Sequence, residues 1–184
     1  MNPVSDEAVM LQVRNGELSR LAVLFERRHR GLFNFFYRLT GNREQSEDLT
    51  QEVFMRILKY RKSFRPHASF TAWMFQIARR VHIDAGRKGG REVAWDEDRP
   101  EPASTEPAAD DSLRKTQEVF LVRKALAGLP ADSREVLVLS RYHDLKYEEI
   151  GQILGCEAGA VKVRVYRAMR ALSRAFAEMA GERI

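Results

Sequence analysis

The sequence predicts an all-α fold of two small helical domains joined by a flexible acidic linker. Apolar residues recur at helical spacing through most of the 184 residues, and few runs show the apolar and polar alternation of a strand. An acidic, proline-containing stretch separates two such helical regions. We expect the first domain over residues 1–88, the linker over 89–112 and the second domain over 113–184.

The region from about residue 5 to residue 88 has the apolar spacing of three or four packed helices. One helix is expected to end at Gly41 and Asn42, which form a turn signal. A second helix is expected over residues 44–60. The side chains assigned to the core of these two helices are Leu21, Leu24, Phe25, Leu32, Phe35, Phe36, Leu39, Leu49, Val53 and Ile57.

The other side of the helix over residues 44–60 is polar. Glu47, Asp48, Gln51 and Glu52 occupy much of it. The early acidic residues suit the positive end of the helix dipole. By composition alone, this side is a solvated face without a further role.

Aromatic and basic side chains gather in the next segment. Phe64 and Phe70 have basic neighbours that include Arg80 and Arg87. A single-stranded nucleic-acid site needs rings for unstacked bases and cations for phosphates, which this segment offers. The competing interpretation is structural, because Phe70 and Trp73 also fall on the buried side of a helix over residues 70–88.

Charge is distributed unevenly along the chain. The formal net charge is +5, yet residues 92–112 contain eight acidic residues against Arg99 alone. This stretch is therefore expected to be an extended linker without regular secondary structure. The remainder is strongly basic, which favours anionic partners.

Residues 147–174 have the spacing of a helix-turn-helix. A short helix is expected to end at Gly155, and Gly151 would let a neighbouring helix approach closely. No acidic residue interrupts residues 159–174, so the outward side of the second helix suits a DNA groove, although a basic face can also be merely solvated. Its buried side is expected to hold Val161, Val165, Ala168, Met169 and Leu172, and its outward side Val163, Arg167, Arg170 and Arg174, flanked by Lys162 and Arg164.

The composition favours neither metal chemistry nor membrane insertion. Cys156 is the only cysteine, and the four histidines stand far apart in sequence. No run approaches the roughly 20 apolar residues of a membrane span, and residues 1–7 lack the pattern of a signal peptide. We therefore expect a cytoplasmic protein without a metal or another cofactor.

The order of these features resembles the sigma-70 family of bacterial transcription initiation factors, in its extracytoplasmic-function class. Residues 47–54 look like the family's region 2.2, residues 70–88 resemble regions 2.3 and 2.4, and residues 129–172 resemble region 4. The likeness covers nearly the whole chain from about residue 17 to residue 176. It implies a protein that binds core RNA polymerase and directs promoter recognition and opening.

The resemblance implies two surfaces on the first domain. The polymerase-binding surface would contain Glu47, Asp48, Gln51 and Glu52, whose charges fit a basic partner. Arg80 stands where family members commonly have asparagine, and we expect it to contact backbone phosphate. The second surface would recognise the minus-10 promoter element and help to melt it. Its candidate residues, from the loop and the following helix, are Phe64, Arg65, His67, Ser69, Phe70, Trp73, Arg80, Asp84, Arg87 and Lys88.

On the second domain, the resemblance implies recognition of the minus-35 promoter element in the major groove. The candidates are Lys162, Val163, Arg164, Arg167 and Arg170. The acidic linker would run into the active-site channel of the polymerase. An anti-sigma factor is a further partner that the resemblance implies, and the isolated protein is expected to be nearly inert.

Two other function classes are open to the sequence. A stand-alone helix-turn-helix regulator would bind an operator as a symmetric dimer, but it needs neither the acidic helix nor the aromatic and basic segment. An enzyme is disfavoured, because the adjacent carboxylates at residues 47–48 and 148–149 diverge by about 100° on a helix and no phosphate-binding loop is present.

Overall fold

The computed structural model describes residues 4–89, 111–142 and 145–181, and these residues confirm the all-α prediction. Within these ranges the chain forms eight α-helices and two short 3-10 helices, without a strand. The first half contains α1 (Asp6–Asn15), η1 (Leu18–Arg20), α2 (Leu21–Thr40), α3 (Arg43–Tyr60), η2 (Arg61–Ser63) and α4 (Phe70–Gly89). The second half contains α5 (Asp111–Ala127), α6 (Ala131–Tyr142), α7 (Tyr147–Leu154) and α8 (Ala158–Gly181).

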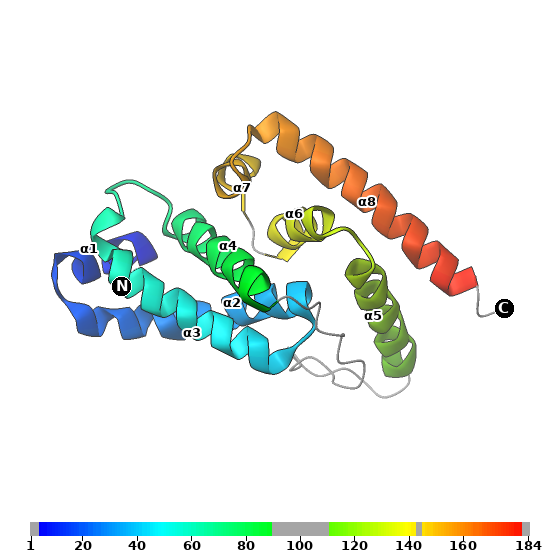
Figure 1. The fold of residues 1–184 in the computed structure, drawn as a ribbon, viewed down its shortest axis with the longest axis horizontal. Helices are drawn as coiled ribbons and strands as arrows, with labels where there is room; N and C mark the ends of the chain where they lie inside the picture. The colour runs from blue at the N-terminus through cyan, green and yellow to red at the C-terminus, as the bar shows by residue number, and fades with distance from the viewer. Residues whose placement is uncertain (1–3, 90–110, 143–144, 182–184) are drawn as a thin grey trace.

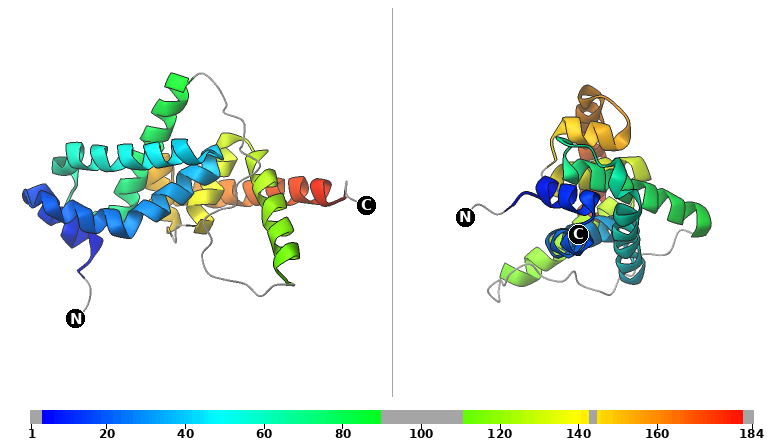
Figure 2. Two further views of the ribbon diagram at one scale, coloured as in Figure 1. Left: turned by 90° about the horizontal axis from the view of Figure 1, so that it is seen from below. Right: turned by 90° about the vertical axis from the view of Figure 1, so that its left-hand side faces the viewer.

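The helices form two modules, which we call the N-terminal module (α1–α4) and the C-terminal module (α5–α8) (Figure 1). In the N-terminal module, α3 packs against both α2 and α4. In the C-terminal module, α8 is the longest helix and packs against α5, α6 and α7. The left view of Figure 2 shows α8 extending away from the N-terminal module towards the C-terminus.

The helix ends follow from local sequence. Gly41 adopts a left-handed φ of 66° and ends α2, as the turn signal predicts. The side chain of Asn42 then accepts a hydrogen bond from the backbone N–H of Gln45 at 2.8 Å and starts α3. Gly155 ends α7 with a φ of 69°, which confirms the predicted turn between α7 and α8.

The predicted apolar stripes form the core of the N-terminal module, with one exception. Leu24, Leu32, Phe35 and Phe36 are buried, but Phe25 is 38% exposed. Its ring stacks on His29 at a centroid distance of 4.9 Å and contacts the Phe54 ring at 4.9 Å. Phe25 lies at the edge of the α2 stripe, where the neighbouring α3 covers only part of the ring.

The two modules contact each other, which the expectation of separately folded domains did not include. Helix α4 packs against α7, and α2 packs against α6. The guanidinium of Arg134 on α6 donates to the backbone carbonyl of Leu39 on α2 at 2.8 Å. It also donates to the carbonyls of Leu129, at 3.1 Å, and Ala127 in its own module. One side chain thus joins the end of α2 to the turn between α5 and α6.

Most of the predicted linker lies outside the described residues. Helix α4 continues through Gly89, and α5 begins at Asp111. The proposed boundaries at residues 88 and 113 therefore fall close to these two helix ends, while the linker itself stays a prediction.

Gly151 on α7 is required by the tight turn of the helix-turn-helix. A β-carbon at this position would lie 2.5 Å from the backbone oxygen of Cys156, whose own N–H donates to the Gly151 carbonyl at 2.9 Å. The two backbone segments therefore touch, as the sequence predicts for this glycine.

We expect Gly151→Ala to destabilise the protein by about 1–3 kcal/mol, because a backbone atom must move to admit the methyl group. The matched control is Gly159→Ala on α8, where nothing lies within 4 Å of the added carbon. That change should be neutral or stabilising by up to about 1 kcal/mol. Urea unfolding of both variants checks this, and equal effects would contradict the packing argument.

Candidate nucleic-acid and polymerase interfaces

The loop over residues 64–69 is anchored at both ends by buried rings. Phe64 and Phe70 are fully buried, and their centroids lie 5.2 Å and 6.3 Å from that of the half-buried Trp73. Arg65 and His67 are exposed between these anchors, and His67 has a left-handed φ of 66°. The structural interpretation offered above for Phe70 and Trp73 agrees with the full burial of Phe70 and the partial burial of Trp73. Phe64, considered above as a ring for an unstacked base, is buried as well.

A hollow of about 470 Å³ lies between α3 and α4 beside this loop. At its edge, Arg56 is held by Glu52 and Asp84, each at 2.7 Å. Hydrogen bonds to Glu52 and then Asp84 raise the pKa of Arg56, so it remains charged. The hollow is lined by Arg56, Tyr60, Ser63, Trp73, Gln76, Ile77, Arg80 and Asp84.

Two predicted minus-10 residues differ in their surroundings. Asp84 is engaged by Arg56, whereas the exposed Arg80 has no hydrogen-bond partner among the described residues. Arg87 is exposed further along α4, and the side chain of Lys88 lies outside the described residues. Arg80 thus offers a guanidinium to a ligand without breaking a bond within the described chain.

The polar side of α3 is exposed as predicted. Asp48 and Gln51 face solvent, while Glu47 accepts a hydrogen bond from Arg43 at 2.9 Å. Met55 lies one turn beyond Gln51 and is 64% exposed. The resulting surface combines free polar groups with one apolar side chain, a combination suited to protein contact.

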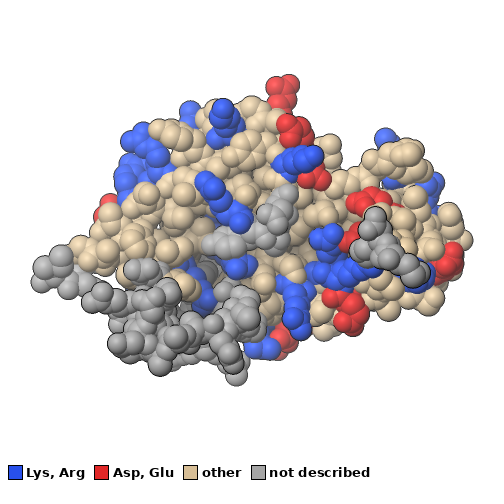
Figure 3. Space-filling view, turned by 180° about the vertical axis from the view of Figure 1, so that it is seen from behind, with Lys and Arg blue, Asp and Glu red and all other residues tan. Residues whose placement is uncertain are grey.

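Helix α8 divides into the two faces that its sequence predicts. Val161, Val165 and Ala168 are buried, whereas all five predicted minus-35 residues are exposed: Lys162, Val163, Arg164, Arg167 and Arg170. Figure 3 shows Lys and Arg side chains along α8, at the upper left of that view.

Tyr166 is a surface residue that the sequence analysis missed. Its side chain is 62% exposed, and the guanidinium of Arg170 lies 6.0 Å from the centre of its ring. Its position four residues after Lys162 and four before Arg170 places it on the same helical face, which is the signal that could have found it.

The C-terminal module covers one side of α4. The hydroxyl of Ser69 donates to Glu149 on α7 at 2.6 Å, and the side-chain amide of Gln76 donates to the Gln152 carbonyl at 3.1 Å. Arg79 donates to both carboxylate oxygens of Glu135 at 3.1 Å. Ser69, a predicted minus-10 residue, is therefore engaged by the C-terminal module.

A second hollow, of about 280 Å³, lies where α4 meets α6. His82 lines it together with Arg79, Arg134 and Glu135, and its buried Nδ1 atom has no hydrogen-bond partner among the described residues. Burial and the charge of Arg134 lower the pKa of His82. Burial raises the pKa of Glu135, against the opposing effect of Arg79.

The described residues give no sign of a metal centre or a membrane span. No group of three or more His, Cys, Asp or Glu side chains in this part of the chain is placed to hold an ion. None of the described helices is both long and apolar enough to cross a bilayer. The expected lack of cofactors stays a prediction.

Comparison with known families matches both modules. Residues 24–92 match sigma-70 region 2, and residues 120–172 match sigma-70 region 4. The chain is 36% identical over 139 residues to the ECF RNA polymerase sigma factor EcfG of Rhodopseudomonas palustris, which covers 76% of this chain and 75% of that protein. It is 31% identical over 153 residues to the ECF RNA polymerase sigma factor SigE of Mycolicibacterium smegmatis, covering 82% of this chain but only 59% of the longer relative.

A solved structure agrees with these relatives. The sigma factor RpoE of Bartonella quintana, in complex with the anti-sigma factor NepR, superposes with a TM-score of 0.66 at 31% identity. The similarity covers 84% of this chain and 94% of that one.

A helix-turn-helix with a basic outer face, packed beside a helical domain with an exposed acidic side, defines a DNA-binding factor of transcription initiation. The chain belongs to the sigma-70 family, in its ECF class, and acts as a sigma factor that directs RNA polymerase. The region 2 match favours this function over a stand-alone helix-turn-helix regulator.

The lowered pKa of His82 predicts a loss of stability in mild acid. Below the ordinary pKa of 6.5, the unfolded chain takes up a proton that the folded protein does not, so stability falls as the pH decreases from 6.5 towards the folded pKa. We expect His82→Asn to remove this part of the pH dependence, measured by urea unfolding at about pH 7.5 and about pH 5.5.

The control for this measurement is His67→Asn, an exposed loop position that does not line the hollow around His82. It should keep the wild-type dependence. The contribution of Glu135 to the pH dependence of stability has the opposite sign, because a carboxyl with a raised pKa loses an unfavourable charge as the pH falls. Glu135 is present in both variants, so its contribution does not affect the comparison. Indistinguishable slopes for wild type and His82→Asn would refute the proposed role of burial.

Proposed function

We propose that this sigma factor divides its work among three surfaces. The exposed side of α3 binds core RNA polymerase, the loop over residues 64–69 with α4 engages the minus-10 element, and the outer face of α8 engages the minus-35 element. The observation that carries this proposal is the match of the two modules to the two sigma-70 regions, together with exposed carboxylates on α3 and exposed basic side chains on α8.

The polymerase contact would rest on Asp48 and Gln51, with Glu47 and Glu52 beside them. Asp48 and Gln51 are exposed and engage no other side chain in the described hydrogen-bond network, so they are available to a basic partner. Met55 on the same side supplies apolar area that would be buried on docking.

The minus-10 contact would use the exposed groups around the hollow between α3 and α4. Arg65, His67, Arg80 and Arg87 offer cations or hydrogen-bond donors to the DNA backbone. Trp73 and Tyr60 line or border the hollow with aromatic surface for an unstacked base. The buried rings of Phe64 and Phe70 would pack against Trp73 and hold it in place, and would not contact the base themselves.

The minus-35 contact would place α8 in the major groove. Arg164 and Arg167 are candidates for base or phosphate contacts, Lys162 and Arg170 for phosphates, and Val163 for a thymine methyl group. Tyr166 joins this set because its exposed ring lies between the basic side chains.

The arrangement of the modules fits a factor that is nearly inert alone. Because α7 covers Ser69 and part of α4, engagement of the minus-10 element would require the modules to separate. The proposed division into residues 1–88, 89–112 and 113–184 allows this, since the linker would let the C-terminal module move. By analogy with the NepR complex, an anti-sigma factor is the proposed inhibitor.

The remaining parts of the proposal follow from the family. Sigma factors are generally DNA-binding initiation factors, and we propose that this chain has no enzymatic activity of its own. It would work in the cytoplasm, where polymerase and promoter DNA are found.

Runoff transcription with sigma-free core polymerase tests the function directly. The full-length chain should confer initiation at defined sites on genomic promoter fragments, which core polymerase alone does not provide. Failure on every such fragment, without an inhibitor present, would argue decisively against the proposal.

Arg167→Ala should weaken binding of the holoenzyme to minus-35 duplex by roughly tenfold or more, because one cation is lost from the DNA-facing helix. The slope of log affinity against log salt should fall by about 1. Arg30→Ala on α2 removes the same charge from an exposed site outside α8 and should leave the slope unchanged. Equal slopes for both variants would remove Arg167 from the interface.

The double change Asp48→Ala and Gln51→Ala should weaken core polymerase binding by roughly tenfold, since two exposed polar contacts are lost. Binding of the same full-length variant to minus-35 duplex should be unaffected. Glu178→Ala on α8 serves as the control for loss of an exposed carboxylate. Fluorescence titration with core polymerase measures this affinity. An unchanged affinity of the double variant would show that this side of α3 does not bind core polymerase.

A further inference from the structure

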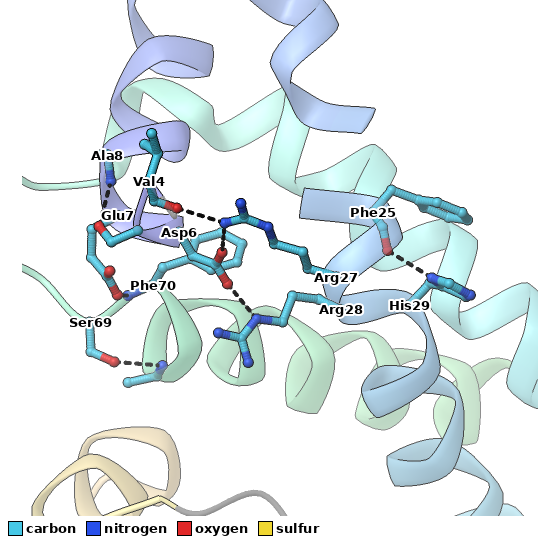
Figure 4. A network of polar contacts seen from close by, with 12 residues as sticks. Val4, Asp6, Glu7, Ala8, Phe25, Arg27, Arg28, His29, Ser69 and Phe70 are labelled. Carbon is cyan, nitrogen blue, oxygen red and sulfur yellow. Dashed lines mark hydrogen bonds and ion pairs between the residues drawn. The ribbon is translucent and has the colours of Figure 1, made fainter. Parts of the chain in front are cut away.

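Helix α1 is fixed to the N-terminal module by a buried carboxylate. Asp6 accepts hydrogen bonds from Arg27, at 2.9 Å, and Arg28 on α2, and Arg27 also donates to the carbonyl of Val4 at 2.8 Å (Figure 4). Burial alone would raise the pKa of Asp6, but the two arginines outweigh burial and lower it, so the carboxylate is charged at neutral pH. Val9, Met10 and Val13 are fully buried on the same helix.

The next residue, Glu7, contacts a different element. Its carboxylate accepts a hydrogen bond from the backbone N–H of Phe70 at 3.1 Å (Figure 4). Phe70 is the first residue of α4, where backbone donors lack partners within the helix. The hydroxyl of Ser69 accepts from the N–H of Ala72 at 3.2 Å. The start of α4 is therefore capped by its own serine and by a carboxylate from α1.

The exposed loop over residues 64–69 ends directly at the start of α4. Phe70 ends the loop over residues 64–69, and its ring packs with Phe64 at a centroid distance of 6.2 Å. Among the backbone hydrogen bonds of the described residues, the one inside the loop runs from the Ala68 N–H to the Arg65 carbonyl at 3.2 Å. The direction in which Arg65 and His67 project consequently depends on where the Phe70 backbone is held.

Glu7 differs from the other carboxylate at this place. Glu149, which accepts from the Ser69 hydroxyl, belongs to the C-terminal module, so that bond is lost when the modules separate. Glu7 belongs to the same module as α4, so its bond does not depend on a contact with the C-terminal module. It also precedes residue 24, where the region 2 match begins.

We propose that Glu7 is a positioning residue for promoter opening, which holds the start of α4 and the adjoining loop in the geometry that meets minus-10 DNA. The inference rests on the proposed function of that loop. Because α1 is anchored on α2 through Asp6, the carboxylate of Glu7 acts from a fixed support.

The first test measures open-complex formation by reconstituted holoenzyme, together with core polymerase affinity. Glu7→Ala should lower promoter opening roughly tenfold, the loss expected for one hydrogen bond to a charged group. Its core affinity should change less than about twofold. Glu7→Gln should recover most of the activity, because the amide oxygen still accepts from Phe70. Glu17→Ala, which removes an exposed carboxylate just after α1, should match wild type.

The second test does not require polymerase. In a Trp95→Phe background Trp73 is the remaining tryptophan, and its ring packs against Phe64 and Phe70. Acrylamide quenching of Trp73 in the free protein should rise by about twofold in Glu7→Ala, because the loop opens more often. It should stay near the wild-type value in Glu7→Gln and Glu17→Ala.

The two tests separate the possible failures. Unchanged opening and unchanged quenching in Glu7→Ala would overturn the proposal, and so would equal losses of opening and core affinity, which indicate general unfolding. If Glu7→Ala does not fold, a Glu7→Gln variant that opens promoters as poorly as an unfolded control refutes the role of the hydrogen bond. Absence of promoter-specific transcription by wild type would instead count against the proposed function, while quenching still decides whether Glu7 holds the loop.

Discussion

The contact of Arg134 with three backbone carbonyls sets the relation between the modules. A guanidinium can satisfy several acceptors in fixed directions, so Leu39 at the end of α2 and the turn before α6 are held at a defined separation. The ion pair of Arg79 with Glu135 and the hydrogen bond of Ser69 with Glu149 lie on the same interface. The bonds of Arg79 and Ser69 hold the C-terminal module against α4 and the residue that precedes it.

The interface between the modules affects the two proposed DNA-binding surfaces unequally. The outer face of α8 is exposed, because α8 packs on its own module through Val161, Val165 and Ala168. Helix α4 instead has one side against α7 and another around the hollow with α3. The contact between the modules thus covers part of the surface proposed for the minus-10 element and leaves the outer face of α8 exposed.

Local patterns predicted what depends on near neighbours in sequence. The stripes of α2 and α8, the turn at Gly41 and the close approach at Gly151 all depend on residues within a few positions, and the structure confirms them. The bond between Glu7 and Phe70 joins residues 63 positions apart, and that between Ser69 and Glu149 residues 80 apart. Such contacts depend on how helices pack, which periodicity does not determine. Phe25 was misassigned for the same reason.

The placement of Arg56 between Glu52 and Asp84 has a consequence for communication along the N-terminal module. Glu52 belongs to the polar side of α3, and Asp84 belongs to α4, so a single cation bridges the two helices. A partner protein that bound the Glu52 carboxylate would break its ion pair with Arg56. Arg56 would then keep Asp84 as the remaining counter-ion of these two, and the lining of the neighbouring hollow would change. Because linkage is reciprocal, a DNA strand bound in that hollow would in turn change the affinity of the protein for a partner that binds Glu52.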